Sequence, residues 1–194
     1  MALLTRQRGG ARRPEANRLW RAAAGAALWA LGGLAPAWAD PQLELAVKAT
    51  YLYKLAPFVS WPGSAWPAPN APLTICVQGA DPFGPLLDRA TAGQAVGPHP
   101  LAVRRLARLE PGSGCQIAYV AGGAAQSQSQ ALQAVEGAPV LTVTDEARGP
   151  GARGIVNLVL EGGKVRFSID AVQADRNGVE ISSKLLALAV AVKR

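Results

Sequence analysis

Residues 43–62 read LELAVKATYLYKLAPFVSWP, and we expect the rest of the chain to fold around this segment. Its apolar side chains recur at helical steps of three and four residues, at Leu43, Val47, Tyr51, Leu55 and Phe58. This spacing puts them on one side of an α-helix and leaves Lys48 off that side. Pro57 should end the helix, because its ring crowds the preceding turn. The segment therefore predicts an amphipathic helix whose apolar stripe covers a sheet.

Residues 1–39 have the three parts of a secretory signal peptide. An arginine-rich start precedes an apolar run over residues 22–34, and Ala37, Trp38 and Ala39 form a small-x-small cleavage site. The apolar run is too short to span a bilayer, which needs about 20 residues. We predict cleavage after Ala39, a periplasmic location and no later membrane span. Residues 40–194 suit a single domain.

The charge of the chain depends strongly on this predicted cleavage. The full sequence has a formal net charge of +7, but residues 1–39 hold six arginines and one acidic residue. The remainder therefore carries only +2. The basic character gives no support for nucleic-acid binding.

Residues 73–194 alternate between strand-like and helix-like segments. We predict strands at 73–78, 101–106, 116–121 and 139–144, a hairpin at 155–160 and 165–169, and helices at 82–91, 124–135, 171–176 and 184–192. This order predicts an α/β sandwich with helices on both faces of a mainly parallel sheet. The first four strands should lie in the order 2-1-3-4, and the hairpin should add an antiparallel edge.

Residues with catalytic or metal-binding chemistry are scarce. His99 is the only histidine, and it lies between two prolines in a predicted loop. One histidine and two cysteines do not make a zinc site, and no GxSxG, GxGxxG or P-loop motif occurs. We expect no enzyme, no metal and no cofactor. Arg148 and Arg153 flank a glycine-rich loop, where they either are solvated charges or clamp an anion or a partner's carboxylate.

The two cysteines, Cys76 and Cys115, both lie in the predicted exported part of the chain. A single disulfide is plausible in an oxidising compartment. If Gly79 and Gly122 align on neighbouring strands, however, the cysteines are staggered by about four residues, or roughly 13 Å. Bridged Cα atoms lie within about 7 Å. A bridge would therefore require Cys115 to curl back from its strand, or a shifted register.

Several blocks of the sequence resemble the YfiR family of periplasmic proteins. The matching stretches are KATYLYKLAPFVSWP at 48–62, LTICVQGADPFGPLLD at 73–88, CQIAYVAG at 115–122, PVLTVTD at 139–145, residues 155–170, and GVEISSKLLALA at 178–189. The resemblance implies an α/β fold, a tendency to dimerise, and a Cys76–Cys115 pair. The loop at 145–154 departs from the family pattern, because it lacks a second cysteine pair.

The resemblance also implies a regulatory role without catalysis. Family members repress an inner-membrane diguanylate cyclase by binding its periplasmic domain, and an outer-membrane lipoprotein relieves the repression, which raises cyclic di-GMP and biofilm formation. The expected partner is such a cyclase or a related sensor kinase. The alternative is a sensor module that binds a small molecule and works with a membrane receptor or kinase. We expect Tyr53 and Trp61 to be the exposed apolar anchors of the partner interface, and Arg148 and Arg153 to be further interface residues.

Overall fold

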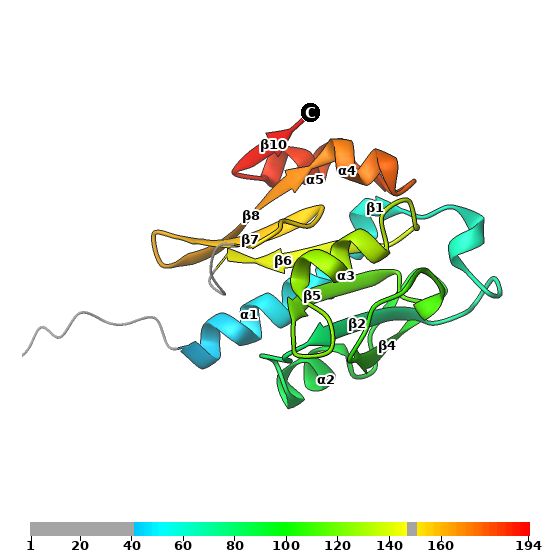
Figure 1. The fold of residues 1–194 in the computed structure, drawn as a ribbon, viewed down its shortest axis with the longest axis horizontal. Coiled ribbons are helices and arrows are strands. Elements are labelled where there is room, and N and C mark those ends of the chain that lie inside the picture. The colour runs from blue at the N-terminus through cyan, green and yellow to red at the C-terminus, as the bar shows by residue number, and fades with distance from the viewer. Residues whose placement is uncertain (1–40, 147–150) are drawn as a thin grey trace, which may run out of the picture. The chain divides into compact units, whose positions relative to one another are not determined.

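In the computed structural model, residues 41–146 and 151–194 are described. The predicted cleavage after Ala39 and the predicted interface residue Arg148 lie outside them. Eight strands form the main sheet, in the spatial order β10-β8-β7-β6-β5-β2-β4-β3 (Figure 1). Their bounds are β2 Leu73–Gly79, β3 Ala95–Val96, β4 His99–Leu106, β5 Ile117–Gly122, β6 Leu141–Asp145, β7 Val156–Glu161, β8 Lys164–Asp170 and β10 Ala191–Lys193.

The centre of this sheet is parallel. Strands β4, β2, β5, β6 and β7 all run in one direction, whereas β8 is antiparallel to β7 and β3 is antiparallel to β4. The predicted α/β class and the predicted order of the first four strands are confirmed. The β7–β8 hairpin is not the last piece of the sheet, because β10 pairs in parallel with β8 beyond it.

Helices cover both faces of the sheet, as Figure 1 shows for α3 in front and α1 behind. Helices α1 (Pro41–Lys54) and α2 (Pro85–Thr91) contribute to the larger buried core, and α3 (Gln128–Ala134) contributes to a second core on the opposite face. Ser127 caps α3 by accepting a hydrogen bond from the Gln130 backbone N–H, at 3.3 Å. After the hairpin come α4 (Ala171–Arg176) and α5 (Ser183–Leu188), and a two-residue strand β9 (Glu180–Ile181) pairs with β1 (Val59–Ser60).

The side of α1 that faces the core differs from the prediction. The buried residues are Lys48, Ala49 and Leu52, while Leu43 is 63% exposed. Val47 and Tyr51 are only half-buried. The predicted stripe is therefore wrong at Leu43, whereas Val47 and Tyr51 pack against the core but remain partly exposed. The reason is that a small alanine allows close packing on the sheet, and that the charge of Lys48 is paired inside the protein.

The ends of two helices also differ from the prediction. Helix α2 begins at Pro85 rather than at residue 82, because the carboxylate of Asp81 accepts a hydrogen bond from the Phe83 N–H and closes a turn instead of a helix. The last helix stops at Leu188, and the chain then forms β10. The backbone N–H of Val190 donates to the Phe167 carbonyl, so the tail pairs with the open side of β8.

The disulfide joins Cys76 to Cys115, with 5.8 Å between their Cα atoms. We predicted that the bridge needs either a shifted register or a Cys115 outside its strand, and the structure shows both. The register between β2 and β5 shifts by one residue near Gly79, and Cys115 lies before β5, outside the strand. Gly114 turns the chain there with a φ of +67°, a conformation that favours glycine.

Candidate functional site

An apolar hollow of about 450 Å³ lies between α1 and the β7–β8 hairpin. We call this surface the α1–hairpin groove, and its apolar lining is Leu43, Val47, Tyr51, Leu160 and Val165. Leu160 is 47% exposed, so both it and Leu43 present large apolar area to solvent. A second hollow of about 280 Å³ continues the groove along the outer side of α1. Contiguous exposed apolar surface of this kind is typical of protein-binding sites.

The walls of the groove are held by contacts across it. The Tyr51 ring meets the Phe167 ring edge-on with 5.9 Å between centroids, and the Tyr51 hydroxyl donates to the Val165 carbonyl at 3.4 Å. Charged residues lie at the rim, with Glu44 on the helix and Lys164 and Arg166 on the hairpin. An apolar floor with a charged rim is the usual anatomy of a protein interface.

A buried charged network fixes the rotation of α1 beside this groove. The Lys48 ammonium is 1% exposed and lies 2.7 Å from the Asp145 carboxylate, which is at the end of β6. It also contacts Glu44 one turn earlier in α1. The Tyr119 hydroxyl of β5 donates to the same Asp145 oxygen at 3.3 Å. We did not predict this network from the sequence, although the Glu44–Lys48 spacing is a known helical ion-pair pattern.

An aromatic cluster of Trp61, Trp66 and His99 lies near the amino end of β5. The Trp61 indole N–H donates to the Gln116 carbonyl at 3.1 Å, and its ring meets Trp66 edge-on. Trp66 stacks on His99 with 3.7 Å between ring centroids. The His99 Nδ1 lies 2.7 Å from the Ala71 carbonyl, so a backbone group orients this imidazole. These contacts give His99 a packing role at a hollow of about 520 Å³.

An exposed charged cluster joins β4 to α2. The Arg105 guanidinium donates to the carboxylates of Asp81 and Asp88. The hydrogen bond from Arg105 lowers the pKa of the Asp88 carboxyl below its ordinary value. These contacts hold α2 against β4.

A family model described as YfiR/HmsC-like matches residues 45–190, which include both cysteines, Lys48 with its partner Asp145, and most of the α1–hairpin groove. The chain belongs to the YfiR/HmsC-like family. No curated protein matches the chain.

Among the predicted interface residues of this YfiR/HmsC-like chain, the three that the structure describes, Tyr53, Trp61 and Arg153, do not form one surface. Tyr53 and Trp61, which we predicted as the exposed anchors, are half-buried and pack against the core, so each keeps only part of its ring accessible. Arg153 is exposed and donates to Glu146 at 2.8 Å. Trp61 contacts Gln116 at the amino end of β5, whereas Glu146, the partner of Arg153, follows the carboxyl end of the neighbouring parallel strand β6. Trp61 and Arg153 therefore lie toward opposite ends of the central strands.

Within residues 41–146 and 151–194, no group of three or more His, Cys, Asp or Glu side chains is placed to hold a metal ion. None of the helices in that part of the chain is long and apolar enough to cross a bilayer.

Proposed function

We propose that this protein is a periplasmic regulator that acts by binding another protein and not by catalysis. Its target is the periplasmic domain of an inner-membrane diguanylate cyclase or a related sensor protein, which it represses. Membership of the YfiR/HmsC-like family supports this role in general terms. The repression would lower cyclic di-GMP and restrain biofilm formation.

The α1–hairpin groove is the proposed docking surface. The observation that carries this assignment is the partly exposed apolar stripe of α1, where Leu43 is exposed and where Val47 and Tyr51 pack against the core but also line the hollow. Burying an exposed leucine against a partner contributes about 1.5–3 kcal/mol. Leu43 and Leu160 border the same hollow, so one apolar side chain of a partner can contact both.

We also propose that the partner contacts the other residues that we predicted from the sequence. Tyr53 and Trp61 offer partly accessible aromatic rings, and Arg148 and Arg153 offer charges for a partner's carboxylates. We propose in addition that the protein forms a homodimer and that an outer-membrane lipoprotein sequesters it. Cleavage of residues 1–39 is the step that would release the protein into the periplasm.

Gene deletion with complementation tests the proposal. Deletion should raise cyclic di-GMP and surface attachment, and the wild-type gene should restore both. A Leu43→Ser/Leu160→Ser double variant should fail to restore them, because both changed side chains are exposed and leave the core intact. Leu188→Ser is the matched control, since Leu188 is 61% exposed but lies outside the groove.

A Tyr53→Ala/Trp61→Ala variant separates the two candidate surfaces. If this variant fails to restore low cyclic di-GMP and the Leu43→Ser/Leu160→Ser variant restores it fully, the interface lies at Tyr53 and Trp61. Unchanged cyclic di-GMP on deletion would exclude a cyclase as the target. Mass spectrometry of the exported protein should find Asp40 at its amino terminus.

A further inference from the structure

Strand β4 has an unpaired edge near the end of the main sheet that lies opposite the β7–β8 hairpin (Figure 1). On one side β4 pairs with β2 over residues 101–106, whereas on the other side it pairs with β3 only at His99 and Pro100. The last hydrogen bond on that outer side runs from the Leu101 N–H to the Gln94 carbonyl, at 3.0 Å. Within residues 41–146 and 151–194, no strand covers the outer side of β4 beyond Leu101.

The outer edge is open because the chain beside it turns away. The segment that precedes β3 turns into the end of α2 at Gly93, which has a φ of +68°, a conformation that favours glycine. The Gln94 N–H donates to the Thr91 carbonyl at 3.0 Å and closes this turn. The short strand β3 shows that the edge accepts a strand, and the turn explains why the pairing stops after Leu101.

The open edge presents backbone hydrogen-bonding groups in a fixed direction. Successive residues of a strand direct their N–H and C=O groups alternately to its two sides. The Leu101 N–H points outward, so the backbone groups of Val103 and Arg105 point outward too, while those of Ala102 and Arg104 point to β2. An open edge of this kind pairs with another extended chain. The ligand that fits the edge is therefore an extended backbone.

The two arginines of β4 are held at the faces of the sheet. By strand alternation Arg104 and Arg105 lie on opposite faces. The Arg105 guanidinium donates to the Gly84 carbonyl at 2.8 Å on the side of α2, and the Arg104 guanidinium donates to the Ser113 carbonyl at 2.6 Å on the other side. Val103 lies between them along the strand direction and is only half-buried. An incoming strand therefore meets the edge without displacing either arginine.

The charges beside the edge select the kind of segment. Residues 101–110 contain three arginines, Arg104, Arg105 and Arg108, and one carboxylate, Glu110. Arg105 is already compensated by the two aspartates that it contacts. Arg104 and Arg108 are exposed, and neither forms an ion pair with another described residue. Because opposite charges on neighbouring strands stabilise their pairing, acidic side chains on the incoming segment are favoured.

We propose that the outer edge of β4 is a second docking site, which binds an extended acidic segment of another protein as an added strand. The backbone of the segment pairs with Val103 and Arg105, and its carboxylates contact Arg104 and Arg108. The segment continues along the edge from the point where β3 stops. This site goes beyond the proposed docking in the α1–hairpin groove and does not depend on it, because β2, β5 and β6 separate β4 from the hairpin.

Binding of synthetic peptides to the purified protein, followed by fluorescence anisotropy, tests the proposal. The probe is a short labelled peptide of alternating glutamate and valine. One control peptide has lysine in place of glutamate, and the other is N-methylated on alternate residues, so that it lacks the donors for strand pairing. We expect saturable binding of the acidic peptide, and binding about tenfold weaker or worse for each control, as loss of hydrogen bonds or of charge attraction predicts.

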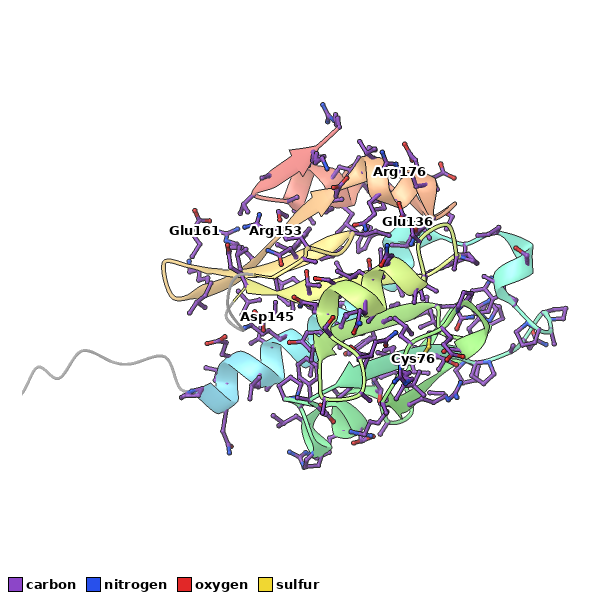
Figure 2. All side chains as sticks on the ribbon, in the orientation of Figure 1. Cys76, Glu136, Asp145, Arg153, Glu161 and Arg176 are labelled. Atoms are coloured by element: carbon purple, nitrogen blue, oxygen red, sulfur yellow. A yellow bond between two sulfur atoms is a disulfide. The ribbon has the colours of Figure 1, made fainter. Side chains whose placement is uncertain are left out.

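Variants of β4 test where the peptide binds. Val103→Pro removes an outward N–H that β2 does not use, and edge strands tolerate proline, so it should weaken binding about tenfold. Val103→Ile keeps that N–H and should bind as the wild type does. Arg104→Glu should weaken binding about fivefold, because an attractive cross-strand pair becomes repulsive. Arg176→Glu is the matched control, since Figure 2 shows Arg176 beside Glu136 and away from Cys76, the β2 residue in register with Arg104.

The proposal is overturned if the acidic peptide does not bind, and the arginines then only protect the edge against aggregation. Equal binding of either control peptide would also overturn it, as would wild-type affinity in both Val103→Pro and Arg104→Glu. A wild-type dimer that Val103→Pro converts to a monomer would assign the edge to a second copy of this chain instead. If Val103→Pro does not fold, the N-methylated peptide and the comparison of Arg104→Glu with Arg176→Glu still decide.

Discussion

Replacing Lys48 by Met tests whether the buried ion pair fixes α1 on the sheet. Methionine has a similar length and stays apolar, so the change removes the charge and leaves only a small gap. Asp145, whose side chain is 4% exposed, then loses the ammonium 2.7 Å away. Removing one member of a buried pair costs about 3–5 kcal/mol, because the remaining charge stays buried without its counterion. That is a large part of the 5–15 kcal/mol by which typical domains are stable.

The measurement is urea unfolding at pH 7 of the wild type, Lys48→Met, Asp145→Asn and the double variant. The double variant removes both members of the Lys48–Asp145 pair and leaves only the partly exposed Glu44 carboxylate of the network. Its loss of stability should therefore be about 2–3 kcal/mol smaller than the sum of the two single losses. Lys184→Met is the control, since this exposed helical lysine should change stability by less than about 0.5 kcal/mol. The reasoning would be refuted if Lys48→Met lowered the free energy of unfolding by less than about 1 kcal/mol and if the effects of the two single variants simply added in the double variant.

Three further predictions concern the rest of the fold. Reducing the single disulfide should lower the free energy of unfolding by about 3–4 kcal/mol, read from urea curves with and without reductant; equal curves would contradict it. Gly79→Ala should lower the melting temperature strongly, because a Cβ there meets the Gly122 backbone and φ is +82°, whereas Gly112→Ala meets nothing within 4 Å and should change little. Arg105 lowers the pKa of the Asp88 carboxyl in the folded protein. The ionised carboxylate therefore stabilises the fold at any pH above its ordinary pKa. This stabilisation is lost as the pH falls through the lowered pKa of the folded state. The wild type should therefore lose more stability than Arg105→Gln between about pH 5 and 2, by less than about 1 kcal/mol since the pair is exposed, as measured by circular dichroism.

The strands were predictable because their signals are local. Residues 139–144 form a nearly unbroken β-branched and apolar run, and the corresponding strand β6 is buried along its whole length. The Gly162–Gly163 pair likewise marks the turn between β7 and β8. Alternation of such strands with helices then restricts the topology, which is why the predicted order holds.

The features that sequence reasoning missed depend on distant partners. A periodicity argument treats Lys48 as a surface residue, but its burial is decided by Asp145, 97 residues later. The tail was predicted as helix, whereas its pairing with β8 depends on an open strand edge that no local pattern reveals. Of the candidate sites, Arg153 could be singled out by its glycine-rich surroundings.

The most direct test of the proposed function is the affinity of the purified protein for the periplasmic domain of the cyclase whose output rises on gene deletion. Isothermal titration calorimetry should be run with the wild type, Leu43→Ser/Leu160→Ser and the Leu188→Ser control. Docking through the α1–hairpin groove predicts that the double variant binds about thirtyfold more weakly or worse, while the control binds as the wild type does. Wild-type affinity in a folded double variant would contradict the assignment of the groove, and no binding by the wild type would contradict the regulatory role itself.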